Sequence, residues 1–293
     1  MRQSRRAMNL ISGVAILATC VSGSLYLSAS TSASASSAAT GLLGKVDQTH
    51  QLSIAMSAYA PEDFETSSGW SGYDVNILTG FAKSLGAKLV INPLPFASTV
   101  VAVSTKRDDL TIDIYYTPAR AKEISFSRPM LNYTDAVAVN GTKSEVKSPM
   151  VADLTGKSIG VVIGSAEVTE AKAVPKATVI QYDNITDSFL ALSSGKIAAV
   201  FVPDVDISWS KHENPSLDIK LLGPVPAKLA PPIASLRGYY GVPKGSYSTS
   251  FSAALNSYLK NIACNGKEQK ILDKYNMTSP QFLAGICKVP NTP

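Results

Sequence analysis

The segment TIDIYYTPARAKEISFSRP, residues 111–129, contains residue types that could bind a small anion. Thr117 is a favoured helix N-cap and Pro118 a favoured first helical residue, so a short helix is predicted to begin here. The first-turn amides of a helix lack intrahelical partners and carry the positive end of its dipole. Arg120 adds a planar guanidinium that can hold a carboxylate through two parallel hydrogen bonds. These residues predict a carboxylate site, although an ordinary capped helix with Arg120 in solvent fits the same pattern.

Strands and helices alternate before this segment. Residues 51–59 and 87–94 read as strands, residues 73–86 as an amphipathic helix that ends at a glycine, and residues 99–106 as a second helix. Strands and helices that alternate through short connections predict a parallel sheet with crossover helices. The segment that contains Arg120 follows these elements and belongs to the same sheet.

The alternation begins again in the second half of the chain. Strands are expected at residues 157–164, 178–182 and 196–203, and helices at residues 165–174 and 186–195. A further strand at residues 238–243 and two helices in residues 248–276 are too few for a third lobe, so they are expected to complete the first.

The predicted fold is therefore α/β with two lobes. Residues 46–132 would form the first part of lobe 1, residues 136–236 lobe 2, and residues 240–293 the return to lobe 1 with a C-terminal tail. Two crossings between the lobes make a hinge, and the cleft between hinged lobes is where small ligands bind.

The N-terminus is typical of an export signal. A basic start, an apolar run and a tract of small residues predict a signal peptide over residues 1–35, cleaved after Ala29 or Ala35. Residues 36–45 are expected to be a flexible linker. An uncleaved anchor helix and a lipoprotein attached through Cys20 are alternatives. Each of these readings places the protein outside the cytoplasm, in the periplasm or beyond, free or tethered.

Two cysteines remain beyond the signal segment. In an oxidising compartment Cys264 and Cys287 would close a loop of about 24 residues and stabilise the fold by roughly 3 kcal/mol. Two unrelated buried thiols are the alternative. His50 and His212 are isolated in the sequence, and neither cysteine belongs to a Cys-x-x-Cys motif, so no metal site is expected.

Charge argues against nucleic acid as a partner. The formal net charge is +5, but three of the 27 basic residues (Arg2, Arg5 and Arg6) lie in the predicted signal, and the others exceed the 22 acidic residues by only two. No basic tract is interleaved with aromatic residues.

The stretch YTPARAKEISFSRP resembles the signature of the family-3 extracellular solute-binding proteins, the polar amino-acid receptors of ABC importers. Other pieces resemble the family in the same order: YAPEDF, GYDVNILTGFAKSLGAKL, LPFASTVVAV, ADLTGKSIGVVIGSA, ALSSGKIAAVFVPD and YYGVPKGS. The resemblance covers residues 51–275. Each piece is weak alone, and their common order makes the resemblance specific.

The resemblance implies roles for three lobe 1 residues. The family arginine that grips the ligand α-carboxylate falls on Arg120, and the aromatic pair that sandwiches the ligand falls on Tyr59 and Phe96. The two aromatic residues could instead belong to the core.

In lobe 2 the resemblance implies that backbone amides of Ser165 and Ala166, at a helix N-terminus with Ser165 as its cap, also hold the carboxylate. The acid that meets the α-ammonium falls on Asp204, with Asp206 as the fallback because the alignment slips by one residue. Alternatively, Ser165 could belong to a simple turn and helix cap, and Asp204 could be an exposed acid in a loop.

Two residues depart from the family pattern. Tyr115 stands where the family has a small hydroxyl residue, and Asp113 where it has glycine or serine. Alternate residues of a strand point to one side, so both changes should face the same region. Asp113 could pair with Arg120 or meet a cation on the ligand, unless the strand register keeps it outside the cleft.

The resemblance implies the two-lobe fold of the type II periplasmic binding proteins, the Venus-flytrap kind. It also implies a substrate-binding protein of an ABC importer that captures an amino-acid-like solute and closes around it. A membrane permease is the expected partner, and a monomer without enzyme activity or cofactor is expected. One alternative is a dehydratase-like enzyme on the same fold, with Glu167, Glu170 or Asp113 as the proton donor. A sensor lobe with an altered pocket is another.

Overall fold

The computed structural model describes residues 40–229 and 236–291. The predicted signal peptide, with Cys20 and its cleavage sites, lies outside these residues. Helix α1 (Gly41–Thr49) begins inside the range predicted to be a flexible linker, so residues 41–45 of that prediction are wrong. Leu42 and Val46 lie one helical turn apart and are fully buried in the core, and this packing holds the helix.

The first sheet has the strand order β4-β1-β5-β13-β6, with β7 paired to β13. Its strands are β1 (Gln51–Met56), β4 (Lys88–Pro93), β5 (Leu110–Tyr115), β6 (Ile124–Phe126), β7 (Leu131–Asn132) and β13 (Arg237–Pro243). β4, β1 and β5 are parallel, whereas β13 is antiparallel to β5 and β6. The chain therefore returns, after the second sheet, to complete the first.

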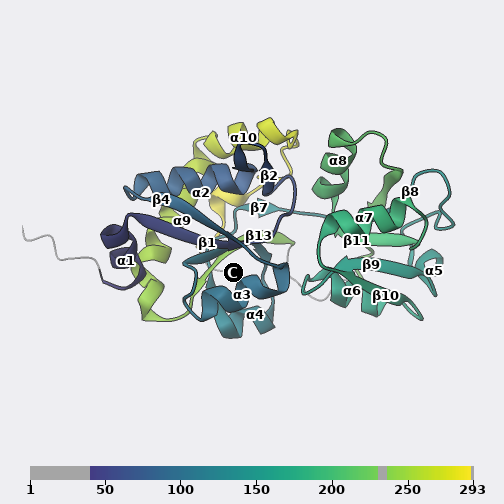
Figure 1. The fold of residues 1–293 in the computed structure, drawn as a ribbon, viewed down its shortest axis with the longest axis horizontal. Coiled ribbons are helices and arrows are strands. Elements are labelled where there is room, and N and C mark those ends of the chain that lie inside the picture. The colour runs from purple at the N-terminus through teal and green to yellow at the C-terminus, as the bar shows by residue number, and fades with distance from the viewer. Residues whose placement is uncertain (1–39, 230–235, 292–293) are drawn as a thin grey trace, which may run out of the picture. The chain divides into compact units, whose positions relative to one another are not determined.

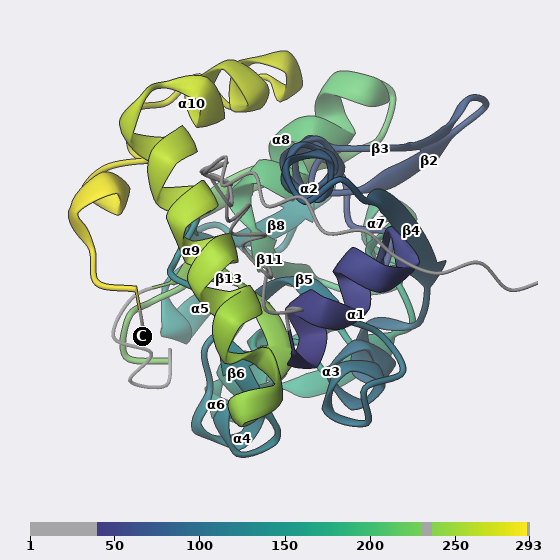
Figure 2. The same ribbon diagram turned by 90° about the vertical axis from the view of Figure 1, so that its left-hand side faces the viewer.

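Helices cover both faces of this sheet (Figures 1 and 2). One face packs on α1, α2 (Tyr73–Ser84) and α9 (Thr249–Cys264), and the other on α3 (Phe96–Ser104) and α4 (Pro118–Glu123). A short hairpin, β2 (Phe64–Thr66) and β3 (Gly69–Ser71), precedes α2, and α10 (Lys267–Leu272) follows α9.

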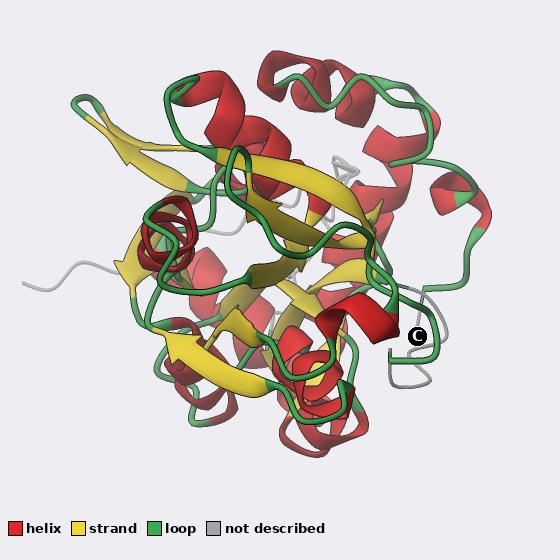
Figure 3. Cartoon of the chain, turned by 90° about the vertical axis from the view of Figure 1, so that its right-hand side faces the viewer, coloured by secondary structure: helices red, strands yellow, loops and turns green. Residues whose placement is uncertain are grey.

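The second sheet has the strand order β10-β9-β11-β8-β12. Its strands are β8 (Asp135–Asn140), β9 (Ser158–Val162), β10 (Thr178–Tyr182), β11 (Ala199–Pro203) and β12 (Ile219–Pro224). Its helices are α5 (Val151–Leu154), α6 (Glu167–Ala173), α7 (Ile185–Ser193) and α8 (Asp204–Glu213). Figure 3 shows these strands flanked by helices. We call the parts built on the first and second sheets lobe 1 and lobe 2.

Both sheets follow one plan. In each, the first two strand–helix units give three parallel strands, and an antiparallel strand lies beside the third. In open α/β sheets, ligands bind beyond the carboxyl ends of the parallel strands. The chain passes between the lobes from β7 to β8 and again from β12 to β13, and the second passage includes residues outside the described ranges.

The predicted disulfide between Cys264 and Cys287 is confirmed, with an S–S distance of 2.04 Å. It ties the end of α9 to the 3-10 turn Ile286–Lys288. The fully buried Arg128 donates to the carbonyl oxygen of Ile286 at 2.7 Å, so the C-terminal segment is anchored to lobe 1 by two independent contacts. None of the helices in the described ranges is both long and apolar enough to cross a bilayer.

Candidate functional site

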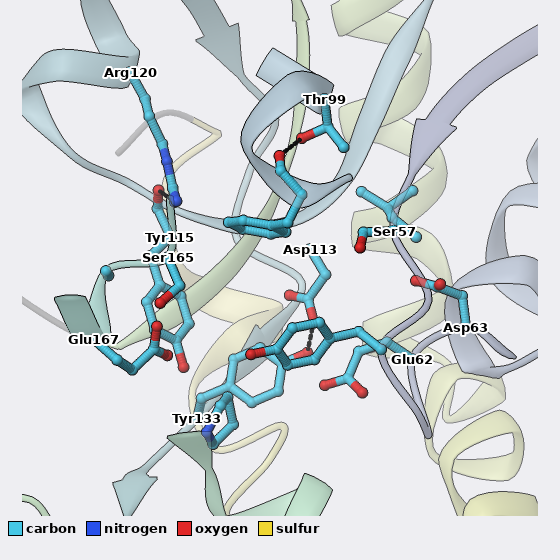
Figure 4. Close-up of a pocket in the computed structure, with 15 residues that line it drawn as sticks. Ser57, Glu62, Asp63, Thr99, Asp113, Tyr115, Arg120, Tyr133, Ser165 and Glu167 are labelled. Atoms are coloured by element: carbon cyan, nitrogen blue, oxygen red, sulfur yellow. Dashed lines mark hydrogen bonds between the residues drawn. The ribbon is translucent and has the colours of Figure 1, made fainter. Parts of the chain in front are cut away.

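A pocket lies at the carboxyl ends of parallel strands from both sheets (Figure 4). Seven of the eight predicted binding residues line it: Tyr59, Phe96, Asp113, Tyr115, Arg120, Ser165 and Ala166. The other lining residues are Ser57, Glu62, Asp63, Thr99, Ile112, Tyr133, Glu167 and Pro203. The pocket has a volume of about 40 Å³. That space holds a few water molecules at most, so an amino acid enters only if lobes or side chains move apart.

Arg120 is held by neutral acceptors from both lobes. The hydroxyl of Thr117 accepts from the amide of Arg120 at 3.1 Å and caps α4, as the sequence predicted. The Nη1 atom of Arg120 donates to the carbonyl oxygen of Tyr115 at 2.9 Å, and Nη2 donates to that of Gly164 in lobe 2 at 3.0 Å. A guanidinium has five N–H donors, so these two bonds orient it and leave further donors for an anion.

The two predicted aromatic residues lie beside each other at the pocket. The ring centroids of Tyr59 and Phe96 are 6.1 Å apart and tilted by 47°. The guanidinium carbon of Arg120 lies 5.4 Å from the Phe96 centroid, within range of a cation–π contact. Phe96 occupies the first position of α3, a turn earlier than the sequence analysis placed the helix start.

Asp113 interrupts the regular geometry of β5. Its φ of +37° lies in the left-handed region, and the pairing of β13 with β5 shifts register between Tyr239 and Gly241. Strict alternation along β5 therefore fails, although both Asp113 and Tyr115 line the pocket. A non-glycine residue in this conformation costs energy, and such residues concentrate at functional sites.

Two tyrosines fix the carboxylate of Asp113. Its Oδ2 accepts from the hydroxyl of Tyr133 at 2.5 Å and from that of Tyr73 at 3.2 Å, and the two hydroxyls contact each other. Its Oδ1 is buried without a partner. A Cβ on Gly238 would lie 2.6 Å from that oxygen, so the neighbouring strand has to carry glycine there. Asp113 does not form an ion pair with Arg120, one of the two arrangements that the sequence left open.

The hydroxyl of Tyr115 forms a hydrogen bond that connects the two lobes. It donates to Oδ1 of Asp135, the first residue of β8, at 2.7 Å. Burial and the neighbouring carboxyl groups of Glu167 and Glu170 raise the pKa of Asp135 well above its ordinary value. Tyr115 therefore reduces the pocket volume and engages an acid of lobe 2.

Lobe 2 contributes the turn after β9. The amide of Ser165 donates to the carbonyl oxygen of Val162 at 3.1 Å, and the cap of α6 is Ala166 without a side-chain bond. The prediction that Ser165 caps this helix is wrong, because α6 begins at Glu167 and Ala166 occupies the cap position. Glu167, the next residue, is buried at the pocket, and burial raises the pKa of its carboxyl group.

The acid predicted to meet an α-ammonium does not line the pocket. β11 ends at Pro203, which lines the pocket, and Asp204 begins α8 with its amide bonded to the carbonyl oxygen of Thr134 at 2.9 Å. The one-residue slip between sequence and family pattern thus places a proline at this position. The fallback residue, Asp206, is fully buried and lies against Glu62 of lobe 1.

The sequence analysis assigned no role to Glu62 and Asp63. The amide and carbonyl of Tyr59 bond to those of Asp63 at 2.8 and 3.0 Å, and the first amides of α2 donate to the carbonyl oxygens of Pro61 and Glu62. These contacts hold the loop over the pocket. The sequence signal that could have revealed Glu62 and Asp63 is the motif YAPEDF, in which two adjacent acids closely follow a strand end and an aromatic residue.

Acidic groups outnumber basic ones at this site. Burial raises the pKa of Glu62 and Asp63 well above their ordinary values, and the neighbouring charge of Asp113 raises both further. Asp113 itself has its pKa raised to about 6 by burial, against the two tyrosine hydrogen bonds. Within the described ranges no group of histidine, cysteine or acidic residues has the arrangement of a metal site.

Two α/β lobes of the same strand order, with a pocket at their strand ends, define a two-lobe binding protein of the Venus-flytrap kind. The family model of the bacterial extracellular solute-binding proteins, family 3, matches residues 52–278, and the chain belongs to this family.

Curated relatives are similar over much of the chain. An arginine-binding periplasmic protein of Mannheimia haemolytica is 27% identical over 237 residues, which are 78% of this chain and 92% of that protein. A probable histidine-binding protein of Campylobacter jejuni is 28% identical over 160 residues, 54% of this chain and 62% of that protein. A solved structure of an ancestral arginine-binding protein bound to arginine is 26% identical, with a TM-score of 0.68, and the match covers 77% of this chain and 98% of that one.

Proposed function

We propose that this protein is the exported amino-acid-binding component of an ABC importer and that Arg120 grips the carboxylate of its ligand. The observation that carries the proposal is the position of Arg120. Its guanidinium lines a pocket between the strand ends of two sheets and is oriented by carbonyl oxygens of both lobes. The names of the relatives support an amino acid as the ligand.

In this proposal the two lobes move about their two crossings, from β7 to β8 and from β12 to β13. The ligand first contacts Arg120, Tyr59 and Phe96 in lobe 1, and lobe 2 then closes with Ser165, Ala166 and Glu167. The closed form presents both lobes to a membrane permease. The predicted N-terminal signal and the extracellular character of the family support export.

A thermal-shift screen tests the carboxylate grip. Amino acids, ectoine-like solutes and polyamines are added to the wild type, to Arg120→Ala and to the control Lys122→Ala, an exposed cation on the same helix. A ligand at 100 times its dissociation constant stabilises by about 2.7 kcal/mol, which is readily measured. The shift given by an amino acid should disappear in Arg120→Ala and persist in Lys122→Ala. An unchanged shift in Arg120→Ala would remove Arg120 from the site.

A dehydratase-like activity is the second candidate because Glu167 is buried at the pocket with a raised pKa, which suits a proton donor. We propose that the protein is not an enzyme, since its relatives named above are binding proteins. Release of phenylpyruvate from prephenate, followed at saturating substrate, decides between the two. Turnover that Glu167→Gln abolishes would establish the enzyme, and no turnover by a protein that binds amino acids would exclude it.

A further inference from the structure

The side of the pocket away from Arg120 contains acidic groups without counter-charges. Figure 4 shows Glu62 and Asp63 on the opposite side from Arg120, Ser165 and Glu167, with Asp113 between the two sides. Glu62 is fully buried, and both of its carboxyl oxygens lack a hydrogen-bond donor. Buried charges are ordinarily paired, so this side lacks a cation.

A second acid from the other lobe faces Glu62. Asp206, in the first turn of α8, is also fully buried, and neither of its carboxyl oxygens receives a bond from a donor. The two carboxyl groups lie within hydrogen-bonding reach of each other. Two carboxylates cannot share such a contact while both are ionised, so in the absence of a cation they must share a proton.

The groups around Glu62 offer no positive charge. The titratable groups that face it are Asp113 of β5, Asp206 of α8, and the phenols of Tyr59, Tyr73 and Tyr133. Arg120 is on the other side of the pocket, and neither Glu62 nor Asp206 forms an ion pair with a basic residue of the described ranges. A cation that replaced the shared proton would therefore have to come from the ligand.

We propose that Glu62 and Asp206, with Asp113 beside them, form a subsite that holds a shared proton when empty and a cationic side-chain group of the ligand when filled. The proposal rests on the amino-acid-binding function proposed above. A ligand carboxylate at Arg120 and a side-chain cation at this subsite select amino acids whose side chains end in a guanidinium, amidinium or ammonium group. The proton leaves to solvent as the cation enters, so the net charge of the Glu62–Asp206 pair is the same in both states.

Isothermal titration calorimetry with three probes tests this subsite. L-arginine carries both a carboxylate and a guanidinium, L-citrulline replaces the guanidinium with a neutral urea, and agmatine lacks the carboxylate. Titrations in two buffers of different ionisation enthalpy count the protons released. The variants are Glu62→Gln and Asp206→Asn, with Glu65→Gln as the matched control because Glu65 is an exposed glutamate of the same lobe.

L-arginine should bind at least about 30-fold more tightly than L-citrulline, the discrimination expected of a buried charge pair. It should also release protons, whereas L-citrulline should release none. Glu62→Gln and Asp206→Asn should each reduce the arginine preference and the proton release, and Glu65→Gln should change neither. Both variants should fold, because the new amide can donate to the remaining carboxylate.

Equal affinities for L-arginine and L-citrulline, or an arginine preference that survives in both variants, would overturn the subsite. If Arg120→Ala still abolished binding in that case, the amino-acid-binding function would stand. Agmatine that binds as tightly as L-arginine would support the subsite and contradict the carboxylate grip. Failure of L-arginine and agmatine alike to bind would overturn the subsite.

Discussion

The two sides of the pocket differ in how their charges are satisfied. The guanidinium of Arg120 already donates to carbonyl oxygens of Tyr115 and Gly164, so the protein orients it before any ligand arrives. The carboxyl groups of Glu62 and Asp206 receive no hydrogen bond from a donor within the described ranges, and their neighbours are each other and the carboxyl group of Asp113. The Arg120 side is preorganised by backbone carbonyl oxygens. The acidic side, which consists of Glu62, Asp206 and Asp113, depends on a proton or a ligand cation to offset its negative charge.

Asp113 combines properties of both sides. Its Oδ2 is fixed by two tyrosine hydroxyls, yet its Oδ1 is buried without a partner, and its backbone is in the left-handed region. Strain that is retained at a pocket suggests that the position of this carboxylate matters. The residue can therefore orient a cation that Glu62 and Asp206 neutralise.

The largest effect in this comparison is expected from Arg120→Lys. Lysine keeps the charge but lacks the fork, so it cannot hold two carbonyl oxygens and a carboxylate together. We expect carboxylate ligands to bind about 30-fold more weakly, a loss of about 2 kcal/mol. Calorimetry with L-arginine measures this loss of affinity. Lys122→Arg, the reverse change on an exposed residue of the same helix, serves as the control, and equal affinity in Arg120→Lys would show that charge alone suffices.

The second effect is the dependence of affinity on pH. The pKa of Asp113 is raised to about 6, and burial and neighbouring acids raise those of Glu62 and Asp206 well above their ordinary values. At pH 5 these groups hold protons that a ligand cation has to displace. L-arginine should therefore bind about tenfold more weakly at pH 5 than at pH 8, since one unit of pKa corresponds to about 1.4 kcal/mol. A constant affinity over this range would contradict the account of the acidic side.

The ligand-free protein should show the opposite dependence. An acid with a raised pKa binds its proton in the folded state at a pH where the unfolded chain has released it. The stability this provides is complete below about pH 4, and it is lost as the pH rises through the folded pKa values, up to about 8 for Glu170. The melting temperature without ligand should fall between pH 5.5 and pH 8, and a rise would refute the assignment.

A smaller effect separates Asp206 from Asp113. Asp206→Asn removes one of two facing carboxyl groups and supplies a donor, so the ligand-free protein should gain about 1 kcal/mol at pH 8. Asp113→Asn should gain less than Asp206→Asn, because the two tyrosine hydroxyls stabilise the ionised carboxylate of Asp113 and donate more weakly to a neutral amide oxygen. Urea unfolding of the two variants measures the difference. Equal changes would mean that the two acids lie in equivalent environments.

The smallest effect is expected from Phe96→Leu. The ring packs beside Tyr59 and under Arg120 but faces no charge of the acidic side. Its loss should weaken L-arginine and L-citrulline alike by about 1 kcal/mol, or about fivefold. Val101→Ala, an exposed position of the same helix, is the control. A loss confined to one of the two probes would show that the ring contributes to selectivity.

The sequence predicted the Arg120 side of the pocket, because its residues lie together in one short motif. Thr117, Pro118 and Arg120 have local roles, capping a helix and presenting a charge, and these follow from neighbours in the chain. The repeated alternation of strands and helices likewise predicted two lobes, because each unit is built from local periodicity.

The acidic side was missed because its parts meet only in three dimensions. Glu62 and Asp206 are 144 positions apart and lie on different lobes. The bulge at Asp113 depends on a register shift in β13, which is distant in sequence. Helix α1 was missed for a similar reason, since its two buried residues are held by packing on α9 that composition does not reveal.

The most direct test of the central claim compares L-arginine with agmatine, which differs from it only by the missing carboxylate, in the wild type and in Arg120→Ala. If Arg120 grips the carboxylate, the wild type should prefer L-arginine by about 100-fold, as for a buried, hydrogen-bonded charge pair. In Arg120→Ala that preference should fall to within about threefold. A preference of similar size in both proteins would show that the carboxylate is bound elsewhere.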